Sequence, residues 1–224
     1  MKRTIFIIVI IAIILYFQYP YVNYVNNSYE IIQYDNPNKS VFENMSSEKK
    51  IAIFTNIPVE LEFEGINYSS FTQEFLETLK QTKIKTLKTN ILENFDYYKI
   101  PLSVKTNVNI NYLTSSTKTP LIYQNSYRFL LTEIKNTCKL YLFSPEQAQN
   151  LYFVNKQTQV DFWNQDLDKY PKLNDANYIV VLLHKNTMIN IPYKWIYCIE
   201  TMEDDCLNIT YSNESIFSAL LKKK

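Results

Sequence analysis

Two cysteines near the C-terminus have the spacing that points most directly to chemistry. Cys198 and Cys206 enclose seven residues, and this short segment contains the acidic run Glu203-Asp204-Asp205. In an oxidising compartment a disulfide could close such a turn, so we predict a Cys198–Cys206 bond. Cys138 is then left over, either as a buried free thiol or as a thiol that pairs with a partner chain.

The other side chains capable of acid, base or metal chemistry predict no catalytic centre. His184 is the single histidine and ends an apolar run, where packing explains it better than a catalytic triad does. Three cysteines and one histidine are just enough for structural zinc, but the gap between the two C-terminal cysteines is too wide for the usual ligand pair. Glu60, Glu62 and Glu64 alternate like the solvated face of a strand, although their separation suits paired glycosidase acids. We therefore predict no catalytic, cofactor-binding or metal-binding residues.

The composition excludes several large classes of enzyme and argues against nucleic acid as a partner. The chain has 224 residues and a single glycine, Gly65. The phosphate-binding loops of dinucleotide and nucleoside-triphosphate sites need several glycines, and so does the G-x-S-x-G turn of hydrolases. Lys and Arg number 23 against 22 Asp and Glu, a net charge of +1, whereas nucleic-acid binders carry a basic excess.

The N-terminus predicts a membrane anchor. An uninterrupted apolar run extends from Ile5 to Phe17, directly after Lys2, Arg3 and Thr4. A helix over residues 4–21 would span about 27 Å at roughly 1.5 Å per residue, close to the hydrocarbon thickness of an endoplasmic-reticulum bilayer. Since the run is not followed by the small residues that cleavage requires, we predict an uncleaved signal anchor.

The positive-inside rule then fixes the topology and divides the chain. Residues 1–3 form a cytosolic tail, residues 4–21 the transmembrane anchor, residues 22–48 a polar stalk, and residues 49–224 a lumenal or extracellular domain. N-x-S/T sequons agree with that side of the membrane and are predicted glycosylation sites. They lie at Asn26, Asn38, Asn44, Asn67, Asn208 and Asn213.

Hydrophobic periodicity predicts a mixed α/β (α+β) domain. Alternation and short apolar runs indicate strands over residues 59–64, 102–112, 138–143, 178–184 and 193–199. Helical spacing and capping residues indicate helices over residues 71–88 and 127–136, after Ser144, and after Asn213. Because strands and helices alternate irregularly, we predict one mixed sheet with three or four helices.

Short segments along the chain carry a resemblance to a known family. They are Tyr19-Pro20-Tyr21, Tyr29, Asn56-Ile57-Pro58-Val59, Ile100-Pro101-Leu102-Ser103-Val104-Lys105, and the run Tyr178–Leu183 with Pro192 and Trp195. In this order they resemble the PIG-S family, a non-catalytic subunit of the glycosylphosphatidylinositol (GPI) transamidase of the endoplasmic reticulum. The resemblance implies a lumenal scaffold domain in a complex whose reaction belongs to another subunit.

These expectations combine into one predicted function with two alternatives. We predict a non-catalytic, single-pass membrane glycoprotein of the endoplasmic reticulum that acts as a scaffold in GPI-anchor attachment and needs no cofactor. Its predicted partners are the lipid bilayer and other membrane-protein subunits, and no nucleic acid. The first alternative is an envelope or host-penetration protein of an AT-rich DNA virus, located in the virion envelope. The second is a type II lumenal hydrolase that acts through carboxylates.

Overall fold

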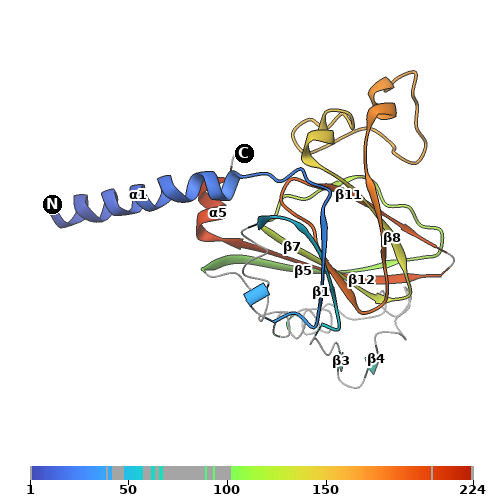
Figure 1. The fold of residues 1–224 in the computed structure, drawn as a ribbon, viewed down its shortest axis with the longest axis horizontal. Helices are drawn as coiled ribbons and strands as arrows, with labels where there is room; N and C mark the ends of the chain where they lie inside the picture. The colour runs from blue at the N-terminus through green and yellow to red at the C-terminus, as the bar shows by residue number, and fades with distance from the viewer. Residues whose placement is uncertain are drawn as a thin grey trace.

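The fold is dominated by β-strands that form two sheets packed face to face (Figure 1). It is known from a computed structural model that describes residues 2–38, 40–41, 48–57, 62–63, 66–67, 89, 93, 102–202 and 204–222. One hydrophobic cluster takes side chains from both sheets, among them Leu131 and Ile189 from one and Leu140 and Ile199 from the other. The two sheets therefore share a single core, as the layers of a sandwich do.

The larger sheet has six strands in the order β1-β2-β10-β7-β12-β5. Neighbouring strands run antiparallel except β1 and β2, which are parallel. The bounds are β1 Ile31–Asp35, β2 Ile51–Thr55, β5 Ser103–Leu113, β7 Arg128–Lys135, β10 Thr187–Asn190 and β12 Cys206–Ser215.

The smaller sheet has four antiparallel strands in the order β6-β11-β8-β9. The bounds are β6 Ile122–Tyr123, β8 Cys138–Phe143, β9 Ile179–Leu183 and β11 Ile196–Thr201. A separate two-stranded pair consists of β3 Glu62–Phe63 and β4 Ile66–Asn67.

Strand β11 of the smaller sheet is covered on both faces, which explains its run of apolar residues, whereas Val180 and Leu182 of the edge strand β9 are exposed. In β11 the side chains of Tyr197 and Ile199 enter the shared core, while those of Ile196 and Cys198 enter a second cluster on the other face. The segment between β8 and β9 covers this second face with buried residues such as Phe162. Burial of such a side chain contributes roughly 1.5 to 3 kcal/mol, so both clusters stabilise the sheet.

Short 3-10 helices and two described α-helices complete the fold. The 3-10 helices η3 Pro145–Ala148 and η4 Pro171–Asp175 lie in the covering segment between β8 and β9. The helix α1 Lys2–Asn23 projects from the sheets, and its C-terminal end packs on α5 Ile216–Leu221 (Figure 1). Lys49 ends α1 by donating from Nζ to the carbonyl oxygens of Val22 (2.7 Å) and Tyr24 (2.9 Å).

The described helices do not include the predicted membrane anchor. Across the described part of the chain, no helix combines enough length and apolar character to cross a membrane. The predicted single-pass, lumenal location, together with the bilayer and the membrane-protein subunits as partners, is corrected by the family assignment reported below. Residues 31–35, predicted to lie in the stalk, form β1 and pair with β2.

The predicted fold class is also wrong, because the domain is mostly β-sheet. Residues 127–136, predicted as a helix, form β7, whose side chains are buried on both faces over most of its length. In a short segment of mixed apolar and polar residues, the sequence pattern alone does not separate a buried strand from a helix. The last helix begins at Ile216 after the N-cap Ser215, since Asn213 still belongs to β12. The predicted helix over 71–88 lies outside the described residues.

Several predicted strands are confirmed. Those expected over residues 102–112, 138–143 and 178–184 correspond to β5, β8 and β9, and the strand expected over 193–199 overlaps β11. The predicted strand over 59–64 is described only at Glu62 and Phe63, which form β3. Alternation thus located β5, and short apolar runs located the buried strands.

Candidate functional site

One carboxylate and two thiols meet inside the sandwich, at the end where β7 turns into β8. Glu133 comes from β7, Cys206 is the first residue of the neighbouring β12, and Cys138 is the first residue of β8 in the other sheet. All three residues are buried, and their ligand atoms lie within 4.8 Å of one another. We call this group the Glu-Cys-Cys cluster.

The carboxylate of the cluster is fixed by the backbone. Glu133 Oε1 accepts hydrogen bonds from the backbone N–H groups of Lys135 (3.1 Å) and Leu207 (3.2 Å). Glu133 Oε2 accepts from the thiol of Cys138 (3.3 Å). Burial, together with the negative charge of a Cys206 thiolate, raises the pKa of Glu133 to about 9, although the three hydrogen bonds oppose this shift.

The two thiols share one hydrogen bond and therefore have different acidities. The hydrogen bond to Cys206, followed by burial, raises the pKa of Cys138, whereas the same hydrogen bond lowers the pKa of Cys206. Cys206 Sγ also contacts the carbonyl oxygen of Thr137 at 3.4 Å. Of the two, Cys206 is the sulfur better suited to be a thiolate.

The structure does not bring together the cysteines that the sequence analysis paired. All three cysteines are buried and free. Cys198 lies in the second cluster, on the outer face of the smaller sheet, whereas Cys206 lies in the shared core with Cys138. Successive side chains of β11 point to opposite faces, and this alternation separates Cys198 from Cys206 despite their closeness in sequence.

A layer of turns closes the end of the sandwich over the cluster. Asn136 Nδ2 donates to the carbonyl oxygen of Asp205 (2.7 Å), which joins the β7–β8 turn to the segment before β12. The Asp205 carboxylate accepts from Tyr112 Oη (2.5 Å) and from the backbone N–H of Ser115 (2.8 Å). Asp205, the last residue of the acidic run 203–205, makes all of these hydrogen bonds and so holds this layer of turns, which we call the cover, in place.

His184 lies beside this cover and not in the cluster. Its side chain is exposed, and Nδ1 is 3.2 Å from Oγ1 of Thr137, the residue before Cys138. The single histidine is thus close to a cysteine of the cluster in the fold, but it packs on the outer side of the turn.

One buried donor near the cluster has no hydrogen-bond partner among the described residues. Asn208 stands directly opposite Glu133 in the register of β12 and β7 and is fully buried. Its Oδ1 accepts from Asn111 Nδ2 (3.0 Å), while its own Nδ2 has no partner in the described part of the chain. A buried amide of this kind is a ready donor to an oxygen ligand.

The predicted glycosylation residues fall in different environments. Asn208 and Asn213 are fully buried in β12, and Asn213 Nδ2 donates to Ser103 Oγ (2.6 Å) and Thr106 Oγ1 (2.7 Å). Asn26 is half-buried and Asn38 is exposed. Asn44 and the side chain of Asn67 lie outside the described residues, as do the side chains of the predicted glutamate row 60–64.

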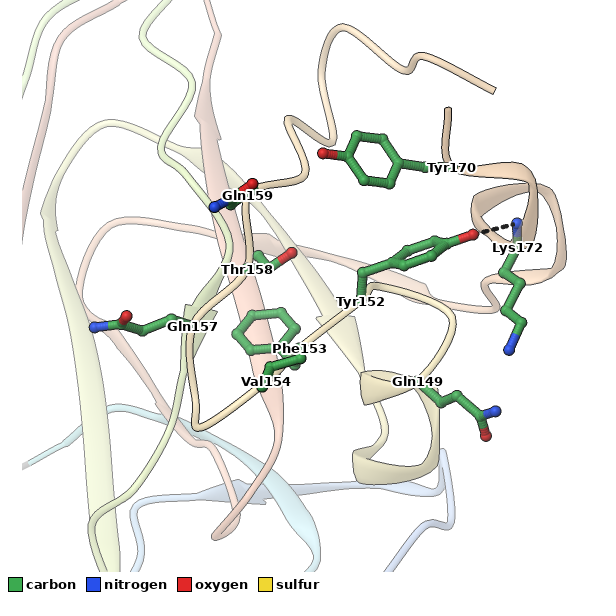
Figure 2. Close-up of a pocket in the computed structure, with 9 residues that line it drawn as sticks. All are labelled: Gln149, Tyr152, Phe153, Val154, Gln157, Thr158, Gln159, Tyr170 and Lys172. Carbon is green, nitrogen blue, oxygen red and sulfur yellow. Dashed lines mark hydrogen bonds between the residues drawn. The ribbon is translucent and has the colours of Figure 1, made fainter. Parts of the chain in front are cut away.

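A surface pocket of about 600 Å³ lies over the segment that follows η3 (Figure 2). Tyr152 and Tyr170 pack edge to face with ring centroids 5.1 Å apart, and Tyr152 Oη accepts from the backbone N–H of Lys172 (3.2 Å). Gln149 and Gln157 lie at its opposite ends (Figure 2). The described lining residues include no carboxylate, histidine or thiol, and therefore none of the usual metal ligands.

Comparison with known proteins places the chain in a family. The sequence profile described as a cupin-like domain matches residues 17–215, so this chain belongs to the cupin-like domain family. Among solved structures, the chain is similar to Peruvianin-I, a cysteine peptidase from Thevetia peruviana latex, with 11% identity and a TM-score of 0.33. That alignment covers 49% of this chain and 50% of the peptidase, about half of its length.

Family membership corrects the functional predictions. It replaces the PIG-S resemblance and supports neither a scaffold in GPI-anchor attachment nor a viral envelope protein. The segments that carried the resemblance are only a few residues long, and such fragments recur by chance. The predicted absence of enzyme activity is also overturned, because cupin-like domains are generally found in oxygenases and hydroxylases and the structure contains a candidate metal-binding group.

The residues of the chain do not fit the iron site that such oxygenases use. Non-haem iron oxygenases of this kind hold Fe(II) with two histidines and one carboxylate. This chain has one histidine, His184, and it lies on the exposed side of a turn. The Glu-Cys-Cys cluster instead offers two sulfur atoms and one carboxylate, a donor set that suits zinc and other thiophilic ions.

Proposed function

We propose that this protein is a metal-binding member of the cupin-like family that holds a thiophilic divalent ion, preferably zinc, through Glu133, Cys138 and Cys206. The observation that carries the proposal is the convergence of three ligand atoms within 4.8 Å of one another in the core. A tetrahedral zinc ion has ligands roughly 2.0 to 2.3 Å away and therefore roughly 3.3 to 3.8 Å apart. Only a small contraction of the cluster is needed to reach these distances.

The electrostatics of the cluster support a cation at this place. Burial raises the pKa of Glu133, because an ionised carboxylate is poorly solvated there, and the hydrogen bond to Cys206, followed by burial, raises the pKa of Cys138. A divalent ion reverses this effect, since it favours the ionised form of each ligand. Binding of zinc at neutral pH therefore displaces protons from the cluster.

The number of protein ligands leaves one position of a tetrahedral ion open. Structural zinc sites are closed by four protein ligands, whereas catalytic sites keep three and a water molecule. Asn208 lies opposite Glu133, and its Nδ2, which has no partner among the described residues, is a donor suited to an oxygen at such a position. We therefore propose a centre with a water or hydroxide as the fourth ligand.

The proposal is tested by metal content and cobalt spectroscopy on the full chain. The reduced protein should retain about one zinc ion per chain after dialysis against trace zinc. Replacement by Co²⁺ should produce a thiolate-to-cobalt charge-transfer band, and titration in two weakly buffered solutions should reveal proton release.

The chain supplies a matched control for these measurements. Cys138→Ser and Cys206→Ser should each abolish the cobalt band, and Glu133→Gln should weaken zinc binding at least about 10-fold. Cys198→Ser removes an equally buried thiol on the other face of the smaller sheet and should leave both measurements unchanged. Zinc content that is equal in all four variants would contradict the proposal.

A further inference from the structure

We propose that Cys138 and Cys206 are also a redox pair, which forms a disulfide between the two sheets and thereby excludes the metal ion. The disulfide itself depends only on the placement of the two cysteines. The exclusion of the ion rests on the function proposed above, because the same sulfur atoms would bind zinc.

The two sulfur atoms are already neighbours in the structure. Each cysteine is the first residue of its strand, Cys138 in β8 and Cys206 in β12. Their Sγ atoms belong to the set that lies within 4.8 Å, and Cys206 Sγ is 3.4 Å from the carbonyl oxygen of Thr137, next to Cys138. A sulfur–sulfur bond of about 2.05 Å then needs only a local movement of two side chains.

The backbones that carry these cysteines are held side by side. The hydrogen bond from Asn136 Nδ2 to the carbonyl oxygen of Asp205 (2.7 Å) joins a residue two positions before Cys138 to the residue directly before Cys206. Disulfides require Cα atoms roughly 4.4 to 6.8 Å apart and side chains that face one another. Turns linked in this way keep the two strand starts together while the side chains change rotamer.

The third cysteine cannot take part without a rearrangement of the smaller sheet. Cys198 packs with Phe143 and Ile196 in the second cluster, and the sheet itself separates it from the other two cysteines. The pairing is therefore specific to Cys138 and Cys206. Cys198 serves as an internal reference thiol in any oxidation experiment.

A disulfide reagent such as glutathione disulfide can serve as the oxidant. One protein thiolate attacks a glutathione sulfur and releases one molecule of glutathione, which gives a mixed disulfide. The second protein thiolate attacks the protein sulfur of that mixed disulfide and releases the second glutathione. Two protein S–H bonds are lost, one S–S bond forms, and glutathione disulfide is reduced to two molecules of glutathione.

Both cysteines are fully buried, so the reagent can reach them only when the covering turns open. The residues at the cover, such as Thr137 and Asp205, are partly exposed, and local opening of turns costs less than global unfolding. Oxidation should therefore be slow in the native protein and slower still with zinc bound, because the ion holds both sulfur atoms.

The test is oxidation of the full, metal-free chain with glutathione disulfide, followed by non-reducing peptide mapping. We expect a peptide pair linked through Cys138 and Cys206, an intact mass lower by two hydrogen atoms, and a free Cys198. The midpoint of thermal unfolding should rise by roughly 5 to 10 °C and return to its original value after reduction, since the bond joins segments far apart in the sequence. Cys198→Ser should behave identically.

A second arm starts from the zinc-loaded chain and measures the ion that remains after complete oxidation. We expect the zinc content to fall at least 10-fold and to recover on reduction. Stable glutathione adducts, a bond to Cys198, or two thiols that stay free would each overturn the redox pair, whatever the zinc result. A linked peptide in a chain that never binds zinc would reject the proposed function and leave the redox pair standing, whereas zinc retained in the oxidised chain would overturn the exclusion.

Discussion

At the scale of single residues, Glu133 shows how one side chain can have both a structural and a chemical role. Its Oε1 accepts from the N–H groups of Lys135 and Leu207, which belong to two neighbouring strands at an irregularity in their register. Its Oε2 faces Cys138. The first role needs only an acceptor oxygen, while the second needs a charge that can bind a cation.

Substitutions at Glu133 should separate these two roles. With a pKa of about 9 the carboxyl is protonated at pH 7, so Glu133→Gln preserves its shape and should change the unfolding free energy of the metal-free protein by less than about 1 kcal/mol. Glu133→Ala leaves two buried N–H groups unpaired and should cost about 2 to 4 kcal/mol. Urea denaturation at pH 7 measures both values. Equal losses in the two variants would show that the N–H groups do not depend on this side chain.

Lys49 is another buried ionisable residue, and it should give the protein a pH-dependent stability. Burial, then the charges of Lys222 and Lys194, lower the pKa of Lys49 to about 8 from 10.5. Between these values the unfolded chain binds more protons than the folded chain, so this group makes stability rise with pH. After allowance for screening by solvent, the gain from pH 8 to 10.5 should be on the order of 1 to 2 kcal/mol. It is measured as the difference in unfolding free energy between the wild type and Lys49→Met at each pH, and a constant difference would contradict it.

At the scale of elements, strand β12 connects the parts of the molecule. It pairs with β7 on one side and β5 on the other, begins with a cysteine of the cluster and ends at the cap of α5. Ser215 Oγ accepts from the N–H of Ser218 (3.0 Å), and Ser218 Oγ accepts from the N–H of Ser215 (2.8 Å). This reciprocal pair starts a helix of only six residues, which is too short to be stable alone.

Loss of the cap should therefore be measurable. Ser215→Ala removes the acceptor for the Ser218 N–H and should lower the unfolding free energy by about 1 kcal/mol. Ser212→Ala is the matched control in the same strand, half-buried and away from the cap, and should stay within about 0.5 kcal/mol of the wild type. If the two variants lose equal stability in urea titrations, the cap contributes nothing specific.

The strands differ in how well their bounds can be predicted from the sequence. The sequence of β5 alternates between apolar and polar residues, and β8 alternates between buried and half-buried residues over most of its length, so the bounds of both strands could be predicted closely. β7 is buried on both faces and was predicted as a helix. β12 was missed, because Asn208, Thr210 and Asn213 are polar side chains inside a sheet, where only tertiary contacts satisfy them.

The cluster could not be predicted, because its members come from three strands of two sheets. Spacing favoured Cys198 as the partner of Cys206, yet the alternation of β11 turns Cys198 to the outer face. Glu133 gave no signal, since it lies in the segment 127–136 that was predicted to be a helix. Only the pairing of β7 with β12, and the packing of β8 across the core, bring the three side chains together.

At the scale of the whole molecule, the Glu-Cys-Cys cluster ties the two sheets of the sandwich together. Glu133 and Cys206 come from the larger sheet and Cys138 from the smaller one, so separation of the sheets pulls the ligands apart. An ion bound at this point can stay in place only while both sheets remain packed. Its binding energy therefore stabilises the entire domain and not just one strand pair.

Zinc should consequently raise the stability of the whole domain in proportion to the logarithm of its free concentration. At a concentration about 100-fold above the dissociation constant the stabilisation is about 2.7 kcal/mol, which for a chain of this size corresponds to a rise of roughly 5 to 10 °C in Tm. Differential scanning calorimetry of the reduced protein over a series of zinc concentrations measures this. Cys198→Ser should show the same slope, because its thiol lies outside the core that the sheets share. Cys206→Ser should show no rise, and a rise equal to that of the wild type in this variant would mean that the zinc binds elsewhere.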